Sequence, residues 1–87
     1  MHTVELLEAA LQAARALDYR VRMEWLGGGG GGTCTVRGER HLFLDLAQGP
    51  AEHLEQVVDV LRQDPRLLAL EILPALQSYL AVPRRAA

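Results

Sequence analysis

A run of six glycines, Gly27–Gly32, divides the chain into two parts that each contain the pattern of a β-strand. Glycine costs more conformational entropy to order than any other residue and accepts almost any backbone path, so such a run ends a regular element. We expect a pliable connection between two strands, because surface loops can be lengthened at little cost. The alternative is a mobile loop that closes over a partner. In either case the chain on both sides of the run is predicted to belong to a β-sheet.

The segment before the glycines alternates between apolar and polar side chains, and this is the clearest strand pattern in the chain. The apolar positions are Tyr19, Val21, Met23 and Trp25. A period of two with one charged face is typical of an antiparallel sheet that has water on one side and helices on the other. Residues 33–36 and 41–46 have the composition of two further strands, joined by residues 37–40. The sequence therefore predicts a three-stranded antiparallel meander.

Apolar residues at helical spacing predict two main helices outside the sheet. The first runs from Thr3 to about Leu17, and the second opens with Gly49 and Pro50 and runs to about Gln63. Proline suits the first turn of a helix, where no amide donor is needed.

The C-terminal part is expected to hold a short third helix from Pro74 to about Val82. Residues 70–73 should be extended, because a residue that precedes proline is pushed out of the helical region. Together the elements predict a single α+β domain over residues 1–83, with the helices on one face of the sheet. Residues 84–87 are expected to form a frayed tail.

Two registers are possible for the second hairpin, and they differ in where Cys34 lies. A two-residue loop at 38–39 would make Cys34 and His41 diagonal neighbours, so that Cys34 could be a nucleophile with His41 as its base. A three-residue loop at 36–38, with Gly38 in the left-handed conformation, would place Cys34 on the face of Leu42 and Leu44. We favour the second register, because it gathers the apolar residues on one face. It predicts a buried, unreactive thiol.

Charge and composition narrow the range of partners. The chain has 87 residues, 49% of them hydrophobic, and a formal net charge of −2. Because general nucleic-acid binders carry a basic face, nucleic acid is not an expected partner. The single cysteine excludes an internal disulfide, and no apolar run reaches the roughly 18 to 20 residues that cross a bilayer. We therefore expect a cytoplasmic protein with no membrane association.

The glycine run superficially matches the phosphate-loop pattern GxxxxGK[ST], which requires a Lys and a following helix. Here the Lys is missing and the run leads into a strand, so the match carries little weight. An anion bound at the loop remains the second hypothesis, and its candidate ligand residues are Gly30, Gly31, Gly32, Thr33 and Arg37.

No catalytic residue, metal site or cofactor is predicted. The helix that contains His53 reads His53-Leu54-Glu55-Gln56-Val57 and therefore lacks the zinc-binding HExxH arrangement. His41 and Asp45 would lie about 13 Å apart on one strand, too far to share an ion easily. We expect these histidines and acids to be solvated surface residues.

The segment Thr33-Cys34-Thr35-Val36-Arg37-Gly38 follows the glycine turn and precedes an apolar strand and a helix that opens with Gly49-Pro50-Ala51-Glu52. This order resembles small, uncharacterised bacterial proteins in which a glycine turn and a Cys precede a V-x-G hairpin. It is also loosely similar to the part of ImmA/IrrE-type metallopeptidases that leads up to their zinc helix. Because HExxH is absent here, peptidase activity is not carried over. The resemblance implies an α+β fold and a bacterial source, with no established function.

The leading hypothesis for function is a non-enzymatic protein-interaction module that pairs with a second copy or with another protein. It rests on the high apolar fraction of a short chain that has no catalytic cluster. Tyr19, Trp25 and Phe43 are the candidate contact residues. A small-molecule or anion-binding domain that uses the glycine loop is the alternative, and capture of a strand at an exposed sheet edge is a third possibility.

Overall fold

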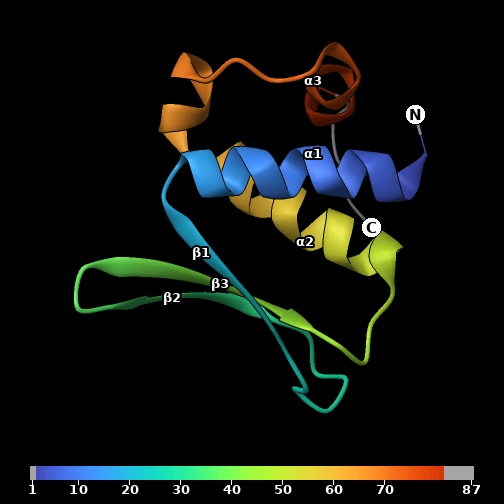
Figure 1. Ribbon diagram of the computed structural model, residues 1–87, viewed down its shortest axis with the longest axis vertical. Helices are drawn as coiled ribbons and strands as arrows, with labels where there is room; N and C mark the ends of the chain where they lie inside the picture. Colours follow the sequence, from blue (N-terminus) through green and yellow to red (C-terminus); the bar gives the residue numbers. More distant parts are fainter. Residues whose placement is uncertain (1, 82–87) are drawn as a thin grey trace.

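The computed structural model describes residues 2–81 (Figure 1). Its elements in chain order are α1 (Thr3–Ala16), β1 (Tyr19–Glu24), β2 (Gly32–Val36), β3 (Glu39–Asp45), α2 (Pro50–Gln63), the 3-10 helix η1 (Pro65–Ala69) and α3 (Pro74–Ala81). This order of helix, strands, helix and helix confirms the predicted α+β class. The end of the predicted domain at residues 82–83 and the predicted tail at 84–87 lie outside the described residues.

The sheet is mixed, so the predicted antiparallel meander is wrong. The strand order is β1-β3-β2, with β1 parallel to β3 and β2 antiparallel to it. The strand with the most buried residues, β3, takes the central position, where both of its edges are paired and Leu42 and Leu44 are buried. All residues of β2 are exposed, as suits an edge strand. Alternation and composition located the three strands, but they say nothing about which strands are neighbours.

The hairpin between β2 and β3 turns at Arg37 and Gly38, whose φ angles of 52° and 79° are both positive. Two positive φ angles are typical of the two-residue turn that matches the twist of a hairpin. This turn pairs Val36 with Glu39 and Cys34 with His41. Neither of the two expected registers is observed, so the favoured one is wrong, and Cys34 is exposed instead of buried. The prediction had assumed that Cys34 must join the leucines of β3 on one face. Leu42 and Leu44 are buried without it, and the register follows the geometry of the turn instead.

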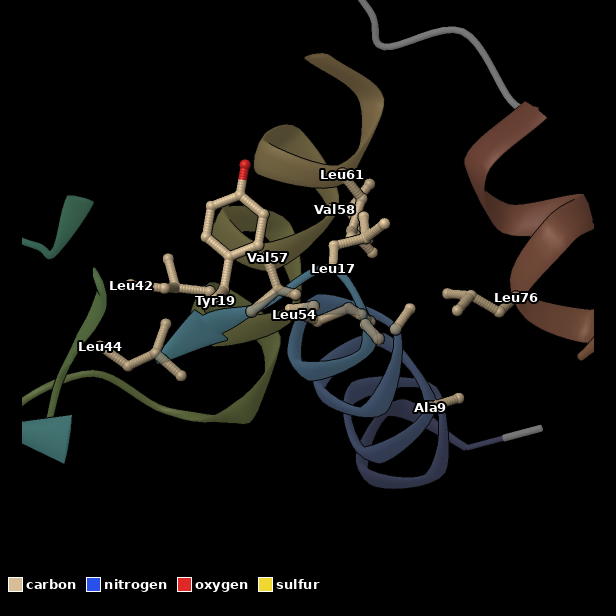
Figure 2. Packing of buried hydrophobic residues seen from close by; sticks show 13 residues of the cluster. Ala9, Leu17, Tyr19, Leu42, Leu44, Leu54, Val57, Val58, Leu61 and Leu76 are labelled. Carbon is tan, nitrogen blue, oxygen red and sulfur yellow. The ribbon is translucent and has the colours of Figure 1, made fainter. Parts of the chain in front are cut away.

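The core lies between the sheet and the helices, which cover one face of it (Figure 1). The inward side chains of β3 meet the apolar stripe of α2, and Figure 2 shows this packing together with Leu76 of α3. The stripe of α2 consists of Leu54, Val57, Val58 and Leu61. On α1 the buried positions are all alanines, and such small side chains let two helices approach closely. The opposite face of the sheet is left uncovered by any described element.

Candidate functional site

The glycine loop is held by the side chain of Asp45, the last residue of β3. One carboxylate oxygen, Oδ1, accepts hydrogen bonds from the backbone N–H of Leu26 at 3.1 Å and of Ala47 at 2.9 Å. The other, Oδ2, accepts from the N–H of Gly28 at 2.8 Å and of Gly30 at 3.2 Å. Because β3 lies between β1 and β2, the loop must cross the end of β3 to connect them. The carboxylate meets it at this crossing.

Asp45 is fully buried and is surrounded by donors. Backbone N–H groups, that of Ala47 foremost, lower the pKa of Asp45 below its ordinary value, although burial acts in the opposite direction. The main-chain carbonyl of Asp45 accepts a hydrogen bond of 2.7 Å from Nε2 of His53, which is also buried. Both residues were expected on the surface, and this expectation is wrong. The sequence does contain a signal for Asp45. It is an acidic residue directly after Leu42-Phe43-Leu44, in a chain whose glycine run has backbone N–H groups that no side chain shields.

The backbone of the loop explains why most of its residues are glycines. Gly27, Gly28 and Gly30 have φ angles of 75°, 81° and 83°, which side chains rarely tolerate. A Cβ atom at Gly31 would overlap the carbonyl oxygen of Phe43. By contrast, nothing lies within 4 Å of the place that a Cβ would take at Gly32. The loop therefore has a defined conformation, and its glycines are not equivalent.

The residues predicted to bind an anion are separated by this arrangement. The amide of Gly30 already donates to Asp45, and Gly31 packs against the backbone of β3. Gly32 and Thr33 are exposed on β2, while Arg37 lies in the turn at the other end of the hairpin. The protein thus fills the anion position of the loop with its own carboxylate.

The uncovered face of the sheet brings together a row of polar and aromatic side chains. Across the strands, Arg20 is opposite His41 and His41 is opposite Cys34. The rings of His41 and Phe43 are stacked with centroids 6.1 Å apart, and the Arg22 guanidinium lies 5.8 Å from the Phe43 centroid. Nδ1 of His41 is buried and has no hydrogen-bond partner among the described residues. The thiol of Cys34 and the imidazole of His41 therefore share this face, whereas the favoured register placed them on opposite faces.

The three predicted contact residues lie in different environments. Tyr19 is buried, and its hydroxyl donates to Asp64 at 3.0 Å, so its ring belongs to the core. Phe43 is half-buried on the uncovered face. Trp25 is 74% exposed at the end of β1, next to Leu26, which is also exposed. Trp25 and Phe43 remain open to a partner.

The two edges of the sheet differ in how they are protected. β1 forms one edge and carries the charged residues Arg20, Arg22 and Glu24. β2 forms the other edge, and its five residues include no charge and no proline. Charged side chains and prolines are the usual means by which an edge strand avoids pairing with another chain. Within residues 2–81 no strand pairs with the outer edge of β2.

The described part of the chain also bears on metal binding and membrane insertion. Over residues 2–81, His, Cys, Asp and Glu side chains form no group of three that could hold a metal ion. None of the helices in the same range has the length and apolar character needed to span a membrane.

Comparison of the chain with protein-family models, with curated proteins and with solved structures gave no match. The resemblance to small bacterial proteins therefore stays an expectation.

Proposed function

We propose that the chain is a non-enzymatic protein-interaction module that assembles as a homodimer through the outer edge of β2. The observation that carries this proposal is that β2 is exposed along its whole length and lacks the charges that protect β1. An unprotected edge offers a row of backbone donors and acceptors to another strand.

The sequence of β2 favours a second copy as the partner. Thr33-Cys34-Thr35 reads the same in both directions, and an antiparallel pair related by a two-fold axis requires such self-complementarity. With the axis at Cys34, each Thr33 lies opposite Thr35 of the second copy. Arg37 then meets the glycine end of the other strand and not a second arginine. The two sheets would join into one continuous sheet without a clash of like charges.

A pair of variants that differ only at residue 33 tests this register. In Thr33→Glu/Thr35→Glu, two acidic side chains face each other on each side of the axis, and like charges directly opposite destabilise strand pairing. In Thr33→Lys/Thr35→Glu, each Lys faces a Glu of the second copy. Residue 35 lies opposite Arg40 of β3 in the monomer, and both variants carry the same Glu there.

Light scattering over a concentration series is the measurement. We expect a dimer for the wild-type chain and for the Lys/Glu variant, and a monomer for the Glu/Glu variant. A wild-type chain that stays monomeric at high concentration would overturn the proposal, and so would equal dimerisation of the two variants. Thermal unfolding of both variants shows whether each one is folded.

The second hypothesis, an anion bound by the glycine loop, has less support. Two of the loop amides that would hold such an anion, those of Gly28 and Gly30, already donate to Asp45. An external anion would have to displace a buried carboxylate that is part of the same chain.

A further inference from the structure

A cleft of about 530 Å³ lies at the end of the sheet opposite the glycine loop. The end of α1, the first residues of β1 and β3, the turn between β2 and β3, and η1 all contribute to it. Its charged lining residues are Arg15, Asp18, Arg20, Glu39, Arg40 and Arg66. A volume of this size is typical of small-molecule sites.

The cleft gathers four of the nine basic residues of a chain whose net charge is −2. Two carboxylates share the lining with these four guanidinium groups, and a third, that of Asp64, lies behind it, so one positive charge is left in excess. The excess of positive charge is therefore local to this cleft and is not a property of the whole surface. A local excess of this kind attracts anions.

Two of the guanidinium groups are fixed by a buried carboxylate behind the cleft. The Asp64 side chain is only 3% exposed, and it accepts from Nε and Nη2 of Arg66 and from Nη1 of Arg40 at 3.3 Å. Both guanidinium carbons lie over the Tyr19 ring, at 5.8 Å for Arg40 and 5.9 Å for Arg66. These contacts hold the two groups in place before any ligand arrives, which lowers the entropy lost on binding.

Each of the arginines has more donors than its contacts within residues 2–81 use. Asp64 engages two nitrogens of Arg66 and one of Arg40, and a guanidinium carries five N–H donors in total. Arg20 is paired with Glu39 at 2.7 Å. Arg15 is exposed and makes no ion pair with any residue in the described range. Arginines with spare donors therefore line the cleft from several elements.

We propose that this cleft binds a small molecule through a phosphate group. A phosphate offers several oxygens to a group of guanidinium forks, and arginine matches its geometry with paired hydrogen bonds. Asp18 and Glu39 supply acceptors for hydroxyl groups elsewhere on the same ligand. The site does not use the outer edge of β2, so it is independent of the proposed homodimer.

Inorganic pyrophosphate is the probe, titrated at constant ionic strength and followed by amide NMR and calorimetry. Saturable shifts are expected at residues 17–20 and 38–40, with none at the glycine loop. Absence of saturable binding up to about 10 mM pyrophosphate, the range of the weakest specific affinities, would overturn the proposal.

Three single variants separate a site from general charge attraction. Arg20→Gln and Arg22→Gln are a matched pair, since both residues lie on β1, both are exposed and each has one surface ion pair. Arg20 lines the cleft and Arg22 does not. Arg15→Gln removes a third cation without breaking an ion pair.

We expect Arg15→Gln and Arg20→Gln each to weaken pyrophosphate binding by about tenfold, as befits a lost charge-assisted hydrogen bond. Arg22→Gln should leave the affinity within about twofold, because screening limits the effect of a charge outside the site. Equal weakening in all three variants would show unspecific attraction and overturn the proposal. All three should keep the wild-type unfolding temperature, since surface ion pairs contribute little to stability.

Discussion

The molecule buries two aspartates, Asp45 and Asp64, and satisfies them in different ways. Asp45 accepts four hydrogen bonds, all from backbone N–H groups of the loop segments around it. Asp64 is bound mainly by the side chains of Tyr19, Arg40 and Arg66. Backbone donors are fixed by the path of the chain, whereas arginine side chains can swing into water. The carboxylate of Asp45 therefore fixes the backbone conformation of the glycine loop, whereas that of Asp64 positions the side chains bound to it.

The largest effect is expected from Asp45→Asn, with Asp64→Asn as its control. Each oxygen of Asp45 faces two N–H donors, so either orientation of an amide sets its NH2 group against two donors. We expect the variant to lose a large part of its free energy of unfolding in urea. In Asp64→Asn the arginines can turn outward and the hydroxyl of Tyr19 can accept, so the loss should be smaller.

Hydrogen exchange distinguishes the two variants by location. Asp45→Asn should remove protection from the amides of Leu26, Gly28 and Gly30, which donate to the carboxylate. Asp64→Asn should change the amide of Arg66, which donates to Oδ1 of Asp64 at 3.0 Å, and leave the loop protected. Equal stability losses with no change at the loop amides would contradict the role assigned to Asp45.

An intermediate effect is expected from Gly31→Ala, with Gly32→Ala as the matched control. A Cβ at position 31 would overlap the carbonyl oxygen of Phe43, and forced displacement of packed backbone costs about 1–3 kcal/mol. At position 32 the space is open and φ lies outside the left-handed region. There, alanine should be neutral or stabilise by about 0.4–1 kcal/mol through the unfolded state. Urea unfolding measures both, and equal effects would contradict the loop conformation.

The most gradual effect is expected from pH, which tests whether both carboxylates are charged in the folded protein. The pKa of Asp45 is lowered chiefly by the Ala47 N–H, and the pKa of Asp64 chiefly by its hydrogen bond from Arg66. A lowered folded-state pKa stabilises the protein above the unfolded value of about 3.9, and this stability is lost as pH falls below it. We expect unfolding temperatures to fall from about pH 4 downward. Each Asn variant should show a shallower fall.

The sequence predicts the elements of this fold well and their arrangement less well. Periodicity located the strand at residues 19–24 and the helix at residues 50–63, because both patterns are local. The order β1-β3-β2 depends on contacts between residues far apart in the chain, which no local pattern encodes.

The candidate sites show the same limit. Arg37 and Gly38 both take positive φ, and reading them as a two-residue turn would have given the correct pairing of Cys34 with His41. The role of Asp45 could not be predicted from a strand pattern that assigns it to a solvated end. The arginine cleft combines residues from four separate elements, so only the folded chain brings them together.

The bonds of Asp45 to the loop also imply an order of events in folding. They join residues that are 15 to 19 positions apart, so the loop has no partner until β3 has paired. A segment of glycines is the part of an unfolded chain with the most freedom to lose. Ordering of the loop should therefore come late, after the sheet has formed, and the loop should be among the first segments to open when the sheet is weakened. Refolding followed at the amides of Gly28 and Gly30 would report the last step of assembly.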